Sequence, residues 1–275
     1  MKSLFACFLF AVGSCASGDA IIKVKGSDTE VNLAVQFAES FHEVNETSIV
    51  SISGGGSGLG IASLINGNAD IANSSRRIND EELELFKKKK IVLDSFVFAQ
   101  DAIAFVVAKD LKLDTISTID LAKVLSGVYK NWEALTDKKV QINIYGRQNN
   151  SGTHDFVKQR LSIDFTPYAK QMNGNAQIIE AIKTDHSGIG YVGAGYVGHG
   201  ANTEIKVLYI KDGVVKRPVS PLDATSIVAG LYFFQRPLFQ YYRRSSISKI
   251  KAFLQFENSD QGQQIIRTAG YYPFK

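Results

Sequence analysis

The stretch Ser53-Gly54-Gly55-Gly56-Ser57-Gly58-Leu59-Gly60 lies between two segments of different periodicity. Before it, Ile49 to Ile52 has the composition of a short β-strand, and after it Ile61 to Ile65 is apolar enough for a buried helix. Glycines allow a tight turn and a close approach of the backbone, and a helix that starts here leaves its first N–H groups unpaired. The stretch therefore predicts a strand–loop–helix unit whose loop can contact a ligand.

The same arrangement recurs on both sides of this loop. Upstream, a strand at Ile21 to Val24 is followed by a polar turn and by apolar positions at helical spacing from Val31 to Phe41. Downstream, a short strand at Asp70 to Ala72 ends in the polar run Asn73 to Arg77. Strand, polar loop and helix alternate within seventy residues, which predicts a parallel α/β fold.

Further elements follow in the rest of the chain. We expect a β-rich stretch at Val92 to Val107, interrupted by Gln100-Asp101, and an aromatic run near the end that is interrupted at Arg236-Pro237. The expected helices are 80–90, 119–125, one that begins at His154, and a final one at 247–256, while the expected strands are 140–145, 189–192 and 205–210. No linker rich in Pro, Gly or Ser separates these elements, which favours two lobes joined without a flexible connection.

Four polar loops share one kind of chemistry, and each follows a predicted strand. They are Gly26-Ser27-Asp28-Thr29, Gly56-Ser57-Gly58, Ser74-Ser75-Arg76 and Arg147 to Thr153, with Ser151-Gly152-Thr153 at its end. Ligands in open α/β sheets lie at the carboxyl ends of strands, and helix N-termini there suit anions. The planar guanidinium of Arg147 can bind two oxygens of one anion. Each Ser or Thr could instead be a plain N-cap, and Arg147 could be a surface residue or a structural ion-pair partner. The four loops together favour a site for a small tetrahedral oxyanion.

Enzymatic and metal-binding motifs are not supported. Leu59, Ile61 and Ser63 stand where glycines of nucleotide-binding or nucleophile-elbow motifs would be needed. The four histidines, His42, His154, His186 and His199, lack the spacing of metal ligands. The net charge of +4 comes from dispersed Lys and Arg, which argues against a nucleic-acid partner. We therefore expect a binding protein without cofactor, metal or catalytic residues.

The N-terminus has the pattern of an export signal. A basic start, Met1-Lys2-Ser3, precedes the apolar run Leu4 to Val12, which is too short to span a bilayer. Val12-Gly13-Ser14-Cys15 resembles the lipobox of bacterial lipoproteins, which predicts a signal peptide at 1–14 and acylation of Cys15. The alternative is an ordinary signal cut between residues 16 and 20. Cys7 would be removed with the signal, so the mature chain would have no internal disulfide. We expect an exported protein in the periplasm or at the cell surface, held to a membrane by lipid.

These loops resemble a known family, the Pst-type phosphate-binding receptors of bacterial high-affinity phosphate ABC transporters. The resemblance extends from Gly26 to Pro273 and is strongest at Gly54 to Gly58 and at Arg147-x-x-x-Ser151-Gly152-Thr153. Weaker marks are Asn66-Gly67, 70–72, Gly127 with Trp132, 190–192, 236–238 and 262–271.

The resemblance implies a type II periplasmic binding protein: two α/β lobes with mixed sheets flanked by helices, a two-segment hinge, and the ligand cleft between the lobes. Lobe I would comprise residues 19–100 and 226–275, and lobe II residues 101–225. The phosphate-binding residues carried over by the resemblance are Ser27, Asp28, Thr29, Ser57, Ser75, Arg147, Ser151, Gly152 and Thr153. The implied partners are inorganic phosphate and the permease of an ABC importer, and we expect a monomer.

One position departs from the family pattern. Many members have an aspartate where this chain has Ser75, and that carboxylate accepts a hydrogen bond from protonated phosphate and repels sulfate. Asp28 could supply the missing acceptor, and Arg76 could add a donor. The alternatives are a receptor for sulfate or molybdate, an exported phosphoesterase, or an adhesin or sensor that binds phosphate without a transporter.

Overall fold

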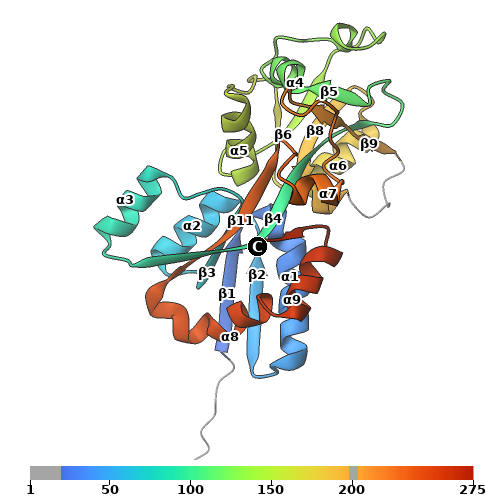
Figure 1. Ribbon diagram of the computed structural model, residues 1–275. Helices are drawn as coiled ribbons and strands as arrows, with labels where there is room; N and C mark the ends of the chain where they lie inside the picture. Colours follow the sequence, from blue (N-terminus) through green and yellow to red (C-terminus); the bar gives the residue numbers. More distant parts are fainter. Residues whose placement is uncertain (1–19, 198–203, 275) are drawn as a thin grey trace, which may run out of the picture.

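The computed structural model describes residues 20–197 and 204–274. The predicted signal peptide (1–14), the predicted acylation site Cys15 and residue 19 lie outside the described residues. Figure 1 shows two halves joined through two long strands, β4 (Leu93–Ala108) and β11 (Gln235–Arg243). No helix in the described part of the chain is long and apolar enough to cross a membrane.

The first half contains a parallel sheet formed by the N-terminal strands. β1 (Ala20–Gly26) pairs in parallel with β2 (Ser48–Ser53) and with β3 (Ile71–Ser74). Helices α1 (Val31–Val44), α2 (Ser57–Asn66) and α3 (Asp80–Lys88) follow these strands in turn. The chain returns to this half at its end with α8 (Ile247–Glu257) and α9 (Asp260–Thr268), which pack on α1. Phe41 of α1 lies 5.3 Å from Phe253 of α8, measured between ring centroids.

The second half has its own parallel strands, β6 (Asn143–Arg147), β7 (Lys170–Met172) and β8 (Gly188–Gly193). Its helices are α4 (Thr118–Leu125), α5 (Gly152–Leu161), α6 (Asn175–Thr184) and α7 (Ala224–Val228). A small parallel pair, β5 (Thr115–Ser117) with β10 (Tyr209–Lys211), lies beside it. The core includes Trp132, which is fully buried and donates from Nε1 to the Ser187 carbonyl at 2.8 Å.

β4 and β11 make the two halves one structure. The N-terminal part of β4 pairs antiparallel with β11, and its C-terminal part pairs with β8 and with β9 (Ile205–Val207). The short β12 (Tyr272–Pro273) also pairs with β4. The result is a mixed sheet in which antiparallel strands connect two parallel sets, as the resemblance implied. One core draws on residues 102–234 and another on 22–99 and 238–271. The expected lobe boundaries, 100/101 inside β4 and 225/226 inside α7, stay predictions.

Most predicted elements are confirmed, and several details were wrong. The helix expected to begin at His154 begins at Gly152, and β11 continues through Arg236-Pro237. Gln100-Asp101 does not interrupt β4, because Asp101 is buried against an arginine of β11. The segment 205–210 forms two strands, β9 and β10, rather than one. The helix at 247–256 is not the last, since Ser259 caps α9 by accepting from the Gly262 N–H at 3.2 Å. The strand expected at 140–145 begins at Asn143 and continues to Arg147.

Candidate anion-binding site

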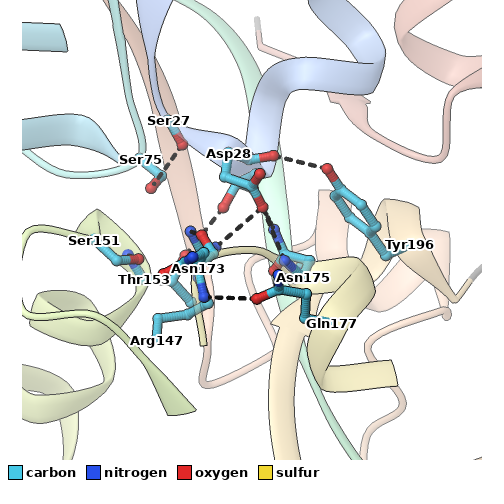
Figure 2. Close-up of polar contacts among 12 residues, drawn as sticks. Ser27, Asp28, Ser75, Arg147, Ser151, Thr153, Asn173, Asn175, Gln177 and Tyr196 are labelled. Atoms are coloured by element: carbon cyan, nitrogen blue, oxygen red, sulfur yellow. Dashed lines mark hydrogen bonds and ion pairs between the residues drawn. The ribbon is translucent and has the colours of Figure 1, made fainter. Parts of the chain in front are cut away.

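Five buried hydroxyl groups from both halves meet where α2 and α5 begin. We call them the hydroxyl cluster: Ser27, Thr29, Ser57, Ser75 and Thr153. Ser27 Oγ donates to Ser75 Oγ at 3.1 Å, and the Ser75 N–H donates to Ser57 Oγ at 3.1 Å. Figure 2 shows the Ser27–Ser75 contact beside Ser151 and Thr153. The loops that follow β1 and β3, together with the start of α2, thus supply the first half's share of the cluster.

The second half reaches this cluster through α5. Thr153 Oγ1 lies 3.0 Å from Thr29 Oγ1, which comes from the opposite half. A Cβ at Gly152 would lie 2.5 Å from Ser57 Oγ and 2.6 Å from Ser75 Oγ, closer than side chains pack. Only glycine allows the two halves to approach this closely, so the N-terminus of α5 directly faces the serines of the other half.

The N-cap alternative holds for Ser151, one of the serines in the four predicted loops. Ser151 is the N-cap of α5, and its Oγ accepts from the Thr153 N–H at 3.2 Å. Ser27 forms no side-chain cap bond, and the N-cap of α2 is Gly56, which leaves the Ser57 side chain for Ser75. Capping therefore does not explain the convergence of Ser27 and Ser57 on Ser75.

Arg147 ends β6 and is only 2% exposed. Its Nη2 donates to the Asn173 carbonyl at 3.0 Å, and its Nη1 lies 3.4 Å from Asp28 Oδ2. Within the described residues, Nε and Nη1 form no hydrogen bond although both are buried. Burial lowers the pKa of Arg147, while the nearby Asp28 raises it. A permanently charged group with unsatisfied donors is what an anion would complete.

Asp28 lies at the edge of the site and connects the halves. Its Oδ2 accepts from both the backbone N–H and the Nδ2 of Asn175, each at 2.8 Å. Its carbonyl accepts from the Tyr196 hydroxyl at 2.7 Å, also in the second half (Figure 2). The carboxylate is thus already held by Asn175 and Arg147. A role in accepting a proton from phosphate stays a prediction.

The sequence reasoning did not predict one pair of site residues, Arg236 and Asp101. Both are 1% exposed, and Arg236 Nε and Nη2 bind Asp101 Oδ2 at 3.0 and 2.8 Å. The same Nη2 also donates to Thr153 Oγ1 at 2.9 Å and to Thr29 Oγ1 at 3.2 Å. Burial raises the pKa of Asp101, and Arg236 opposes this. The available signal was a charge of opposite sign in each of two largely apolar segments, since buried charges are usually paired.

The Arg76 guanidinium is bound by acidic side chains. Its Nη1 and Nη2 each donate to Glu82 at 2.7 Å, and its Nε lies 2.9 Å from Asp155 Oδ2. Glu82 belongs to α3 in its own half and Asp155 to α5 in the other. Its charged group is therefore bound by two acids, one from each half, and ties the halves together. A role as a further donor to the anion stays a prediction.

Two acidic side chains, Asp101 and Asp28, lie beside the candidate site, and each is bound to an arginine. Over residues 20–197 and 204–274, no group of three or more His, Cys, Asp or Glu side chains could hold a metal ion. The arrangement can therefore bind an anion through hydroxyls, backbone N–H groups and one available guanidinium.

Comparisons with known proteins agree with this geometry. A family model described as a PBP superfamily domain matches residues 13–261. The phosphate-binding protein PstS of Borreliella burgdorferi is 25% identical over 266 residues, covering 94% of this chain and 91% of that protein. PstS of Staphylococcus haemolyticus is 27% identical over 282 residues, covering 94% and 87%. A crystal structure, with bound phosphate, of a substrate-binding protein from Clostridium perfringens has a TM-score of 0.82 at 21% identity, covering 93% of this chain and all of that one. The relatives confirm the predicted resemblance, and the structure confirms the fold class.

Proposed function

The chain belongs to the PBP superfamily, and we propose that it is an extracytoplasmic receptor that captures inorganic phosphate for an ABC importer. Capture consists of closing the two lobes around the ion, without chemical conversion of it. The relatives that share about a quarter of its sequence over nearly its whole length are phosphate-binding proteins by name.

The observation that supports this best is the state of Arg147. Its guanidinium is buried and, among residues 20–197 and 204–274, its Nε lacks a hydrogen-bond partner, while the Asp28 carboxylate is 3.4 Å from Nη1. Leaving such donors unpaired costs several kcal/mol, and an anion between Arg147 and the hydroxyl cluster would remove that cost. We propose Ser27, Thr29, Ser57, Ser75, Arg147, Ser151, Gly152 and Thr153 as the phosphate contacts, with Asp28 at the rim.

Phosphate would favour the closed arrangement because the contacts come from both lobes. Thr29, Ser57 and Ser75 belong to one lobe, while Arg147 and Thr153 belong to the other. The hinge would lie where β4 and β11 pass between the lobes, near the hydrogen bond from the Ile103 N–H to the Phe234 carbonyl at 3.1 Å. Binding then shifts the population toward closure, since only the closed form offers the full set of donors.

Titration calorimetry of the mature protein with phosphate, sulfate, molybdate and arsenate tests the proposal. We expect one phosphate per chain and stabilisation that grows with phosphate concentration. Trp132 fluorescence is a poor readout, because this residue is fully buried in the core of lobe II and bonded to Ser187. Sulfate binding without any response to phosphate would assign the site to another oxyanion.

Ser75 is the observation that favours the rival oxyanion, because its uncharged hydroxyl cannot repel sulfate. We propose that Asp28 supplies the missing discrimination. Asp28→Ala is then expected to weaken phosphate by about tenfold and sulfate by less, since only protonated phosphate can donate to a carboxylate. An unchanged ratio of the two affinities would remove Asp28 from this role, and Glu39→Ala on the exposed side of α1 serves as control.

The finer features of the protein are part of the same proposal. We propose that Cys15 carries the lipid that holds the receptor at a membrane, that the lobes comprise residues 19–100 with 226–275 and 101–225, and that the receptor is a monomer that docks on a permease. Loss of membrane association in a Cys15→Ser variant, measured by fractionation, would support the anchor.

A further inference from the structure

A cavity of about 590 Å³ lies beside the hydroxyl cluster. Three segments enclose it: the loop 75–79 after β3, the second turn of α5, and the first residues of β11. Ser75 and Arg236 belong both to the wall of this side cavity and to the hydrogen-bonded network of the hydroxyl cluster. A cavity of this volume exceeds what a single inorganic phosphate needs and is typical of sites for small organic ligands.

The lining of the side cavity combines apolar surface with the charged side chains of Arg76, Asp155 and Lys158. Phe156, Pro237 and Phe239 contribute apolar surface. The Arg77 guanidinium carbon lies 5.3 Å from the centroid of the Phe239 ring, and the Arg236 guanidinium carbon lies 5.6 Å from that of Phe156. Rings and guanidinium planes arranged in this way stack well on a further flat ring. A purely inorganic second anion would leave this apolar surface unused.

Ser75 stands at the junction between the hydroxyl cluster and the side cavity. Its hydroxyl is 1% exposed, receives a bond from Ser27 Oγ at 3.1 Å, and lies 3.4 Å from Ser57 Oγ. A hydroxyl can donate as well as accept and carries no charge. A carboxylate here would require a P–OH group on this side, whereas a serine also accommodates an ester oxygen, which accepts a hydrogen bond but has no proton to give.

Because the hydroxyl cluster and the side cavity meet at Ser75, we propose that the protein also binds phosphate monoesters that carry a small aromatic group. The phosphoryl group would occupy the proposed phosphate site, and the ester group would pass Ser75 into the side cavity. This inference rests on the proposed function, because it uses the same site for the phosphoryl group. The volume of the side cavity limits the ester group to one ring with short substituents.

Competition calorimetry with phenyl phosphate, methyl phosphate and inorganic phosphate tests the inference on the mature protein. We expect phenyl phosphate to displace phosphate at one molecule per chain, and to bind about tenfold more tightly than methyl phosphate because its ring is buried. Phosphate binding without competition by phenyl phosphate would overturn the inference and leave the proposed function intact. Absence of phosphate binding would instead overturn the proposed function itself. Two phosphates per chain would identify the side cavity as an anion site and also overturn the inference.

A cavity-filling variant locates the ester group. Gln159 is exposed on α5 and lines the side cavity, so Gln159→Trp is expected to fill it without disturbing the core. Phosphate affinity should stay unchanged, which also shows that the variant folds, while affinity for phenyl phosphate should fall at least tenfold. Gln264→Trp, the same change on the exposed face of α9, should alter neither. Equal phenyl phosphate affinity in Gln159→Trp and in the unmodified protein would place the ring elsewhere and contradict the proposal.

Discussion

Two buried arginines lie beside the hydroxyl cluster, and their surroundings differ. Arg236 binds Asp101 through two nitrogens at 2.8 and 3.0 Å, and it also donates to Thr29 and Thr153. Arg147 has no comparable partner, since Asp28 approaches only to 3.4 Å and Nε is unsatisfied. The two residues are equally hidden from water, at 1% and 2% exposure.

This difference in partners distinguishes an arginine that stabilises the fold, Arg236, from one that is available to bind a ligand, Arg147. Arg236 belongs to β11, which runs between the lobes, and its charge is balanced within the protein in the absence of any ligand. Arg147 is the last residue of β6, before the loop that leads to α5, and its charge is balanced only in part. Buried charge that the protein leaves unbalanced is costly, so it is retained where a ligand supplies the counter-charge. Substitution of Arg236 should therefore mainly lower stability, and substitution of Arg147 should mainly lower phosphate affinity.

The largest effect is expected at Arg236. Replacing it with Met leaves the Asp101 carboxylate buried without its partner, so Arg236→Met should lower the free energy of unfolding by about 3–5 kcal/mol. Urea unfolding without phosphate measures this loss. The double variant Asp101→Leu with Arg236→Met removes both charges and should recover most of it. No recovery in the double variant would show that the ion pair is not the cause.

Arg147 should give the reverse result. Arg147→Met is expected to weaken phosphate binding by about 10²–10³-fold, because charge-assisted hydrogen bonds contribute roughly 1.5–3 kcal/mol each. Stability without phosphate should be unchanged or higher, since a partly unpaired buried charge is removed. Calorimetry and urea unfolding on the same samples measure both quantities, with the exposed Arg267→Met as control. A large loss of stability would make Arg147 a framework residue like Arg236.

A buried acid, Glu257 of α8, extends the comparison to the pH dependence of stability. Burial raises the pKa of Glu257 to about 8, and the hydrogen bond from Gln240 opposes this. Because the folded-state pKa lies above the unfolded value of 4.5, the neutral acid stabilises the fold most below pH 4.5, and this stabilisation is lost as pH rises toward 8. The slope from this group is up to about 1.4 kcal/mol per pH unit.

Glu257→Gln removes this titration, so its stability should depend less on pH than that of the unmodified protein between pH 5 and pH 8, roughly the window set by the two pKa values. Urea unfolding at several pH values measures the difference. Glu39→Gln, on the exposed side of α1, should leave the pH profile as it is. Parallel profiles for the Glu257 variant and the unmodified protein would show that this carboxyl is not protonated in the fold.

The smallest effect is expected at a third arginine, Arg76, whose charge is balanced by acids of both lobes. Arg76→Gln should weaken phosphate by about two- to fivefold, because a partly exposed ion pair across the cleft contributes roughly 0.2–1 kcal/mol to closure. The dissociation constant at two salt concentrations measures this. Lys87→Gln, which breaks an ion pair within α3, should have no effect on phosphate.

Local sequence was sufficient for the elements that carry the site. The alternation of short strands and helices up to residue 77 predicted the parallel sheet of β1, β2 and β3, and the glycines at 54–58 predicted the loop before α2. Arg147 with Ser151-Gly152-Thr153 predicted the polar start of α5. These features follow from residues within a few positions of one another, where propensity and turn chemistry act directly.

Contacts between residues far apart in the sequence could not be predicted from local sequence. Asp101 and Arg236 are separated by 135 positions, so each reads as an irregularity in its own strand until β4 and β11 pair. Asp28 meets Asn175 across 147 positions, and Gly152 meets Ser57 only across the two halves of the fold. The sequence by itself determined the loops, their donors and the helix starts that face them, because these depend on neighbouring residues. Tertiary structure alone decided which arginine is balanced within the protein, since that depends on which buried acid the folded chain places beside each one.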